Sequence, residues 1–331
     1  MTFSVLLLFS VAGSRSEPYN KPVAGSRSES NKISRTFTKM KYICNILAPL
    51  ILLSCEKKIN FTLHDSPTVL VVDAAIESGK PPIVYLSRSF DYYSQISPAV
   101  LANAFVHNAD VYISNGILTH KLKEYHVDSL GGFRIYFYSI DSANLATAFV
   151  GQFNSNYSLR IVSEGKEYIS STTIPILAKK PDTMFWKKAP SFVDTTKVNV
   201  MVRSTDPPGL GNYIRYFTKR NSGPYLPGES SVYDDQIIDG TTYEVKVEPG
   251  IDRNNPVKYE DNYFLRGDTV TLKLCNIDRN TFNFWNGMEF AYQSIGNPFS
   301  SPNKVIGNVS NGALGVFCGY AVFYKTLIIP K

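Results

Sequence analysis

The sequence contains few of the residues that build metal and nucleotide sites. Its four histidines are His64, His107, His120 and His126. The closest pair, His120 and His126, has neither the i,i+4 spacing of a helical metal site nor the i,i+2 spacing of neighbours on a strand. A P-loop, a dinucleotide-binding glycine motif and the G-x-S-x-G turn of α/β-hydrolases are also missing. We therefore expect no catalytic residue, no cofactor and no metal ligand.

Acidic residues give only weak signals of a site. Asp234, Asp235 and Asp239 could supply the clustered oxygen ligands that calcium prefers. They lack the spacing of an EF-hand loop, so we favour a solvated acidic turn. Carboxylate pairs for glycoside hydrolysis are set by the fold rather than by spacing, and nothing in the sequence selects one.

The sequence also lacks a usable surplus of positive charge. Its 34 Lys and Arg outnumber its 28 Asp and Glu, which would favour a nucleic-acid partner. However, seven of the basic and two of the acidic residues lie in residues 1–54. From Cys55 onward 27 basic residues stand against 26 acidic ones. No basic stripe remains to bind a phosphate backbone, so we expect no nucleic-acid partner.

The apolar run from Tyr42 to Leu53 is too short to span a bilayer. It has twelve residues, whereas a spanning helix needs about 20. Lys41 precedes the run, and this arrangement is typical of a secretory signal peptide, which we place at residues 40–54. The end of the run, Leu52-Leu53-Ser54-Cys55, resembles the lipobox at which bacterial lipoproteins are processed. We predict that Cys55 is lipidated, because more than one acyl chain gives stable membrane anchoring.

Residues 1–39 do not fit a signal peptide that starts at Met40. They contain a tandem repeat, Val11–Glu17 and Val23–Glu29, in a segment rich in Ser, Lys and Arg. We interpret Met40 as the true start and residues 1–39 as an over-extended or disordered leader. The alternative is that Met1 to Val11 is the signal, because its beginning is also apolar.

Short β-prone runs separated by turns dominate the chain after Cys55. The turns Asn115-Gly116 and Ser163 to Lys166 each lie between two such runs and predict hairpins. Three prolines and four lysines between Pro175 and Pro190 interrupt this rhythm. We place a domain junction there.

The predicted fold is mainly β. It consists of an Ig-like or prealbumin-like sandwich at residues 55–178, a linker at residues 179–190, and a second β-rich domain with one helix at residues 191–331. Asp278 is a good N-cap residue, so we expect the helix near residues 279–292.

Aromatic residues on loops are candidate ligand contacts, because they give contact area at low entropy cost. We interpret residues 221–240 as a loop that contains Tyr225 and Tyr233, and Tyr292 lies in the helical region. These three tyrosines are the candidate ligand-binding residues. The alternative is that such rings belong to the core, which we favour for Trp285.

Cysteines are scarce as well. The four are Cys44, Cys55, Cys275 and Cys318. The first lies in the predicted signal peptide and the second is the predicted lipid site. Cys275 and Cys318 remain as a candidate disulfide in an oxidising compartment, or as two buried free thiols.

The C-terminal part carries a specific resemblance. It contains Asn297-Pro298-Phe299-Ser300-Ser301-Pro302-Asn303, followed by Gly307-Asn308-Val309-Ser310-Asn311-Gly312-Ala313-Leu314-Gly315-Val316-Phe317. Together with the lipobox and the early strand Thr68 to Ile76, this tract resembles the Bacteroidota lipoprotein family known as domain of unknown function 4249. The resemblance covers Cys55 to the C-terminus.

The resemblance implies a lipid-anchored protein of the outer membrane, on its periplasmic or its cell-surface face. It also suggests a TonB-dependent outer-membrane receptor as a partner. No catalytic residues are established for the family. Surface lipoproteins of this phylum often carry acidic residues after the lipidated cysteine, whereas here Lys57 and Lys58 follow Glu56.

We therefore expect a non-enzymatic accessory or ligand-binding lipoprotein linked to nutrient uptake through a TonB-dependent receptor. One alternative is a secreted envelope hydrolase that acts on glycans with carboxylates the sequence does not reveal. Another alternative is an adhesin or structural envelope protein.

Overall fold

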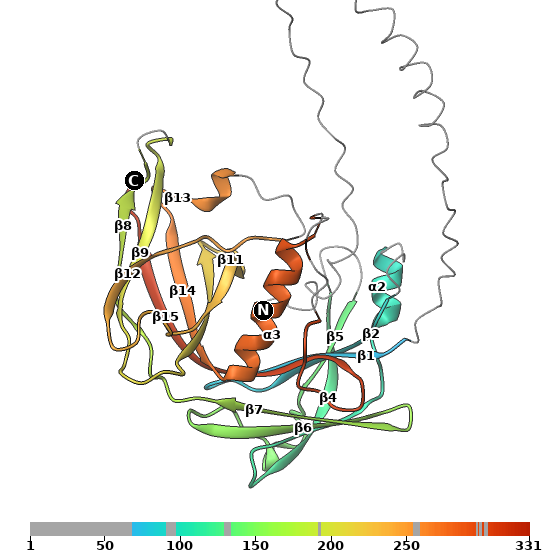
Figure 1. Cartoon of the computed structure of the whole chain (residues 1–331). Coiled ribbons are helices and arrows are strands. Elements are labelled where there is room, and N and C mark those ends of the chain that lie inside the picture. The colour runs from blue at the N-terminus through green and yellow to red at the C-terminus, as the bar shows by residue number, and fades with distance from the viewer. Residues whose placement is uncertain are drawn as a thin grey trace, which may run out of the picture. The chain divides into compact units, whose positions relative to one another are not determined.

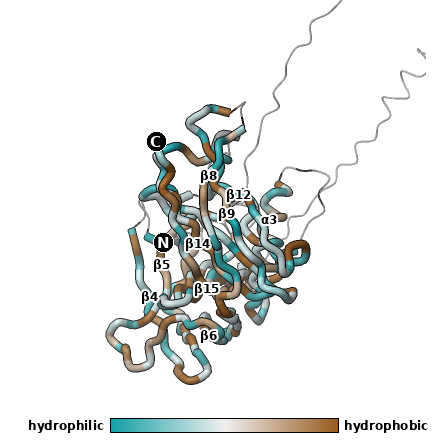
Figure 2. The backbone as a smooth tube through the Cα atoms, turned by 90° about the vertical axis from the view of Figure 1, so that its left-hand side faces the viewer, coloured by the Kyte–Doolittle hydropathy of each residue, from teal (hydrophilic) through white to brown (hydrophobic). Residues whose placement is uncertain are grey.

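Buried and exposed residues alternate along the strands, because successive side chains of a strand point to opposite faces of the sheet. β6 (Ser155–Ser163) and β7 (Lys166–Ile174) follow this pattern over most of their length. Figure 2 shows the same alternation of hydrophobic and hydrophilic residues along the backbone. The computed structural model describes residues 68–90, 97–128, 134–190, 193–253, 259–295 and 304–331, with Asn297 and Ser300. The predicted leader, the signal peptide and Cys55 lie outside the described residues.

One large sheet forms most of the fold (Figure 1). It has 11 strands in the order β11-β10-β14-β15-β1-β2-β5-β4-β3-β6-β7. Besides β6 and β7, these strands are β1 (Leu70–Glu77), β2 (Ile83–Arg88), β3 (Asp110–Ser114), β4 (Thr119–Asp128), β5 (Arg134–Ile140), β10 (Tyr213–Arg220), β11 (Tyr225–Tyr233), β14 (Thr269–Ile277) and β15 (Leu314–Ile328). The two predicted hairpins are confirmed, because β3 pairs with β4 and β6 pairs with β7.

The long strand β15 joins the two parts of this sheet. Its residues 314–320 pair in parallel with residues 71–77 of β1. Its residues 321–328 pair antiparallel with residues 269–276 of β14. Figure 1 shows β15, in red, running beside both partners.

The sheet also curls so that β7, at one end of the strand order, packs against β15. Gly319 of β15 lies at the crossing, where a Cβ atom would be 2.4 Å from the carbonyl oxygen of Thr173. Only glycine permits this close backbone approach. The curled sheet encloses a core that includes Val72, Leu159 and Phe317.

A smaller sheet of four strands covers part of the large one. Its strands are β8 (Pro181–Lys188), β9 (Lys197–Thr205), β12 (Thr242–Val247) and β13 (Phe264–Leu265). Val200 and Val202 of β9 pack with Leu272 and Leu274 of β14 in one core cluster. The two sheets therefore form a sandwich in the C-terminal part of the chain.

Within the described residues, two α-helices lie beside the sheets. They are α2 (Pro98–Ala104) and α3 (Arg279–Gln293), and the same residues also form two 3-10 turns, η2 (Leu145–Thr147) and η3 (Tyr259–Asn262). The predicted helix and its N-cap Asp278 are confirmed by α3. Phe284, Trp285 and Met288 form the buried side of α3, which packs against the large sheet. Within the described residues, no helix is both long and apolar enough to cross a membrane.

The mainly β fold class is confirmed, and two sequence interpretations are wrong. Residues 179–190, expected as a linker, contain β8, whose Met184 and Trp186 pack on the core of the small sheet. Residues 221–240, expected as a loop, contain β11. Pro227 is tolerated there because β11 is an edge strand, where a missing N–H breaks no ladder.

The division into two domains at residues 179–190 stays a prediction. Strands from both sides of that point belong to the same large sheet, because β1 pairs with β15. Pro67–Lys331 also falls within one compact unit.

Asn308, in the tract that carries the family resemblance, connects β7 to β15. The Asn308 side chain accepts hydrogen bonds from the Phe317 N–H and the Ser170 hydroxyl. Its amide donates to the carbonyl oxygens of Phe317 and Ser171. The motif is therefore explained by structure, since its polar groups hold two strands together.

Asp278 provides a test of how α3 is fixed to the sheet. Its Oδ1 accepts from the Thr281 N–H at 2.7 Å, and its Oδ2 accepts from the Thr172 hydroxyl and the Thr173 N–H, both at 3.2 Å. Asp278→Ala should lower the unfolding free energy by about 1–2 kcal/mol in urea denaturation, because the cap is lost. The control Asn280→Ala, at an exposed position of the same turn, should change it by less than about 0.5 kcal/mol. Equal stabilities of the two variants would contradict this role.

Candidate functional site

A cavity of about 530 Å³ lies between the two sheets of the C-terminal sandwich. Val202 and Val247 line it from the small sheet, and Ile214, Leu272 and Leu274 line it from the large sheet. Residues two apart on a strand share a face, so β9 and β14 each place a row of aliphatic side chains between the sheets. The same rows form the core further along, at Val198 and Val270. The cavity is therefore a continuation of the core, in the region where the sheets leave space between them.

Aromatic and polar side chains complete the lining. Tyr216 and Tyr233 stack with ring centroids 6.2 Å apart, and Phe282 and Asn286 reach the cavity from α3. Burial raises the pKa of Tyr233 to about 12. Its hydroxyl donates to the Ser230 carbonyl oxygen at 3.1 Å, so the oxygen is left as a hydrogen-bond acceptor. A mostly apolar cavity with a few polar groups is typical of small-molecule sites.

A buried ion pair bounds one side of the cavity. Lys179, which precedes β8, and Asp206, which follows β9, both have side chains that are 0% exposed. Lys179 Nζ lies 2.5 Å from Asp206 Oδ1 and 5.5 Å from the centroid of the Tyr243 ring. The Asn276 side chain of β14 donates to the Lys179 carbonyl oxygen and accepts from the Lys179 N–H, each at 2.7 Å. These contacts fix the ammonium group next to the cavity.

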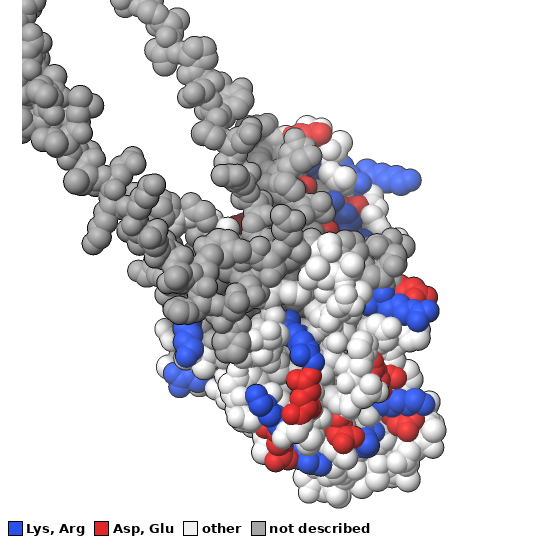
Figure 3. All heavy atoms as spheres, turned by 90° about the vertical axis from the view of Figure 1, so that its right-hand side faces the viewer, with Lys and Arg blue, Asp and Glu red and all other residues white. Residues whose placement is uncertain are grey.

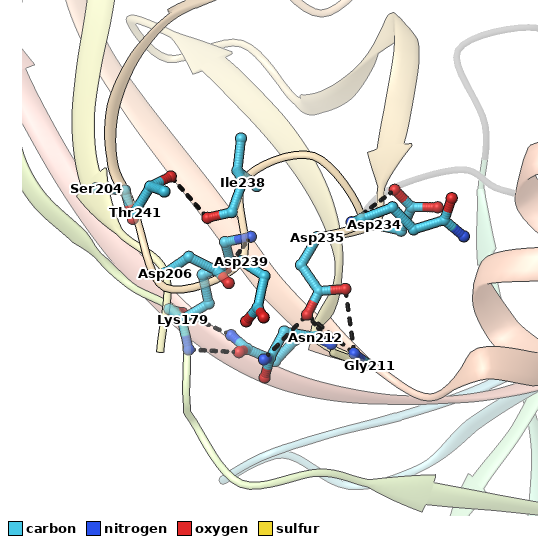
Figure 4. A network of polar contacts seen from close by, with 12 residues as sticks. Lys179, Ser204, Asp206, Gly211, Asn212, Asp234, Asp235, Ile238, Asp239 and Thr241 are labelled. Carbon is cyan, nitrogen blue, oxygen red and sulfur yellow. Dashed lines mark hydrogen bonds and ion pairs between the residues drawn. The ribbon is translucent and has the colours of Figure 1, made fainter. Parts of the chain in front are cut away.

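The loop between β9 and β10 and the loop between β11 and β12 meet beside this pair, as Figure 4 shows. The Asp235 carboxylate accepts from the N–H groups of Gly211 and Asn212 and from the Asn212 amide, at 2.8–3.2 Å. Gly211 has a φ of 114°, a conformation that favours glycine. Asp239 Oδ1 accepts from the Gly209 N–H at 2.7 Å. Burial raises the pKa of Asp235, but the hydrogen bonds from Asn212 and Gly211 outweigh it, so the pKa lies below its usual value.

The expected solvated acidic turn is wrong for Asp235, which is only 1% exposed. Its carboxylate, that of Asp239 and that of Asp206 each offer one oxygen, and these oxygens all lie within 4.8 Å of one another. These three residues are the ones in the described part of the chain that could hold a metal ion. Spacing alone could not reveal this group, because Asp206 comes from a different strand.

The structure separates the three candidate ligand-binding tyrosines. Tyr225 and Tyr233 are the first and last residues of β11, roughly 27 Å apart along an extended strand. Tyr292 lies on α3 under the Arg253 guanidinium, 4.7 Å from its ring centroid. Only Tyr233 of the three lines the cavity. The prediction that Trp285 belongs to the core is confirmed, since it is 4% exposed.

Cys275 and Cys318 are free, buried thiols, so the candidate disulfide is not formed. In the pairing of β14 with β15, Cys275 is opposite Val322 rather than Cys318. The offset of four residues corresponds to roughly 13 Å along the strand, beyond the reach of a disulfide. The structure therefore agrees with the alternative that Cys275 and Cys318 are two buried free thiols.

The histidines contribute little to the site. His120 is fully buried. Its Nδ1 lies 2.9 Å from the Thr147 hydroxyl and its Nε2 accepts from the Asp141 N–H at 3.0 Å. Burial lowers the pKa of His120, which keeps the ring neutral in this structural role.

Charged side chains of both signs are interspersed on the face that Figure 3 shows, over its described atoms. Exposed pairs in the described part include Lys121 with Asp110 and Arg160 with Glu167. Such pairs contribute only about 0–1 kcal/mol each. The cavity is therefore a better candidate site than this charged surface.

Most of the chain matches a known family. The model of a family described as Domain of unknown function (DUF4249) matches residues 56–326. No curated protein matches the chain. The matched range includes both sheets apart from the last two residues of β15, the cavity and the acidic residues beside it.

The buried thiols provide a direct chemical test. Burial raises the pKa of Cys275 to about 12 and that of Cys318 to about 11, so almost no reactive thiolate exists at pH 8. Iodoacetamide should label neither residue in the folded protein, and should label both after unfolding in guanidinium without reductant, as peptide mass spectrometry would show. Labelling of the unfolded chain that requires prior reduction would contradict the free-thiol assignment.

Proposed function

The chain belongs to the family described as Domain of unknown function (DUF4249), and we propose that it is a lipid-anchored, non-enzymatic binding protein. In this proposal it holds a small, largely apolar molecule in the cavity between its two sheets. The single observation that carries the proposal is the cavity itself. Its volume of about 530 Å³ falls in the range of about 300–1,000 Å³ of small-molecule sites.

The lining indicates a ligand without a strong charge. The apolar side chains come from both sheets, so a bound molecule would be covered on two sides. Lys179, Lys246 and Asp234 are the charged residues of the lining. The charge of Lys179 is neutralised by Asp206 at 2.5 Å, and the Lys246 ammonium lies 4.9 Å from the centroid of the Tyr263 ring. An anionic group on the ligand would gain little from the paired Lys179 and would lose its hydration. A neutral apolar body with one or two hydrogen-bonding groups fits best.

The alternative of a glycan hydrolase receives less support from the described residues. A general acid needs a raised pKa, whereas the pKa of Asp235 is lowered and Asp206 is paired with Lys179. Burial raises the pKa of Asp73 to about 6, against the opposing effect of Arg215. However, Asp73 does not line the cavity.

The anchor in this proposal is a lipid on Cys55, after cleavage of a signal peptide at residues 40–54. Its support is the sequence pattern Leu52-Leu53-Ser54-Cys55. The protein would then work at the outer membrane, on its periplasmic or cell-surface face. A TonB-dependent receptor is the proposed partner, to which the bound molecule would be passed.

The cavity proposal predicts binding of a neutral apolar probe. The chain from Glu56 to Lys331 should bind N-phenyl-1-naphthylamine with a rise in fluorescence. Val245→Trp places a large ring at the cavity and should weaken binding at least about tenfold, a loss of about 1.4 kcal/mol. The matched control is Val150→Trp, because Val150 is 42% exposed, close to the 44% of Val245, and does not line the cavity.

The control variant should bind the probe like the unmodified chain. The cavity proposal would be rejected if the probe does not bind, or if both tryptophan variants lose the same affinity.

The anchor proposal is tested in cells that process lipoproteins. Cys55→Ala should abolish incorporation of an alkyne-labelled fatty acid and move the protein out of the membrane fraction, because the acyl chains provide its membrane affinity. The matched control Cys44→Ala changes the other cysteine of the N-terminal region and should leave both readouts unchanged. Equal fatty-acid labelling of the two variants would contradict Cys55 as the lipid site.

A further inference from the structure

The acidic residues beside the cavity come from three separate positions and converge on one point. Asp206 follows β9, whereas Asp235 and Asp239 lie in the segment between β11 and β12. Their carboxylate oxygens all lie within 4.8 Å of one another. Figure 4 shows these side chains turned toward the same region, whereas Asp234 points away from it.

Asp206 supplies a second, independent observation. Its side chain is 0% exposed, and neither of its carboxylate oxygens accepts a hydrogen bond from the described residues. The Lys179 ammonium lies 2.5 Å from Oδ1. Within the described part of the chain, Oδ2 accepts no hydrogen bond. A buried carboxylate oxygen without a hydrogen bond is costly, so a ligand at this position would stabilise it.

The charges at this point do not balance. Three carboxylates stand against one ammonium group, so the cluster has an excess of two negative charges when all are ionised. A single divalent cation would restore neutrality.

We propose that Asp206, Asp235 and Asp239 bind one divalent cation of the calcium type. The donors are all carboxylate oxygens, without a histidine or cysteine, which suits a hard cation rather than zinc or copper. Ligands around calcium lie at about 2.3–2.6 Å, so two of them can be up to about 5 Å apart. The three oxygens lie within 4.8 Å of one another, which fits this separation. Calcium also accepts flexible coordination that water completes, whereas magnesium requires a near-ideal octahedron.

The cation would act on the wall of the cavity. Asp234, Ile237 and Ile238 line the cavity and belong to the same segment as Asp235 and Asp239. Ile237 is 95% exposed, so side-chain packing does little to hold this segment. A cation bound to Asp206 at the end of β9 would fix the segment to the small sheet and define one side of the cavity.

Terbium, which replaces calcium and luminesces when a nearby tyrosine transfers energy to it, is the probe. The ring of Tyr243 lies 5.5 Å from Lys179 Nζ, next to the cluster. The full-length protein in detergent should bind one terbium ion, and calcium should displace it. Calcium should also raise Tm by several degrees above the value in EDTA, because a ligand that binds only the folded state stabilises it.

Asp239→Asn is the diagnostic variant. Its amide oxygen can still accept from the Gly209 N–H, so the loop contact is kept while one charge is lost. Terbium affinity should fall roughly tenfold or more, since ligand charge sets the strength of calcium sites. The matched control Asp234→Asn removes a charge from the same segment outside the cluster and should keep the affinity of the unmodified protein.

Lys179→Met tests the alternative that the three carboxylates serve only to neutralise the Lys179 ammonium group. Without the ammonium group the negative excess grows, so calcium should stabilise this variant more than the unmodified protein. The proposal would be overturned if the unmodified protein binds no terbium, or if Asp239→Asn binds it equally well. Equal displacement of terbium by magnesium and calcium would overturn the calcium assignment. None of these readouts depends on the apolar ligand, so the two proposals can fail separately.

Discussion

The double pairing of β15 is the constraint on which the rest of the structure depends. Its first half is the parallel neighbour of β1 and its second half is the antiparallel neighbour of β14. The single strand β15 therefore joins the strands from the N-terminal part of the described chain to those from its C-terminal part in one sheet. Because β1 and β15 lie far apart in sequence, this pairing involves a large loop-closure entropy and is gained only when much of the fold is in place. Gly319 and Asn308 secure the same strand against β7.

The position of β14 and β15 also decides where the cavity lies. β14 presents Leu272 and Leu274 to the small sheet, and its Asn276 holds the backbone of Lys179. The ion pair of Lys179 with Asp206 then ties the start of β8 to the end of β9. Removing one partner of such a buried pair costs about 3–5 kcal/mol, because the other charge is left unpaired.

Local sequence patterns predicted secondary structure correctly where the turn or cap residues of an element lie within that element or next to it. The turns at Asn115-Gly116 and Ser163 to Lys166 lie in the two predicted hairpins, and the helix begins after its predicted cap Asp278. β11 was missed because Pro227 and Gly228 look like turn residues. Their strand conformation is imposed by the neighbours with which they pair.

The candidate site was largely beyond reach of the sequence. Tyr233 was anticipated as a ligand contact, although as a loop residue rather than a strand residue. Lys179 was assigned to a linker, and nothing in its neighbourhood indicates burial beside Asp206. The cluster of Asp206, Asp235 and Asp239 unites residues from two distant segments, and only the pairing of β9 with β12 brings them together. Contacts of this type depend on the fold and leave no local spacing to recognise.

The central claim is that the space between the two sheets of the C-terminal sandwich is a binding site. A crystal structure of the protein with N-phenyl-1-naphthylamine tests it most directly. Our account predicts electron density for the probe between Val202 and Leu274, in contact with the side chain of Tyr233. Probe density elsewhere, or closure of the two sheets so that their side chains fill the space, would contradict the account.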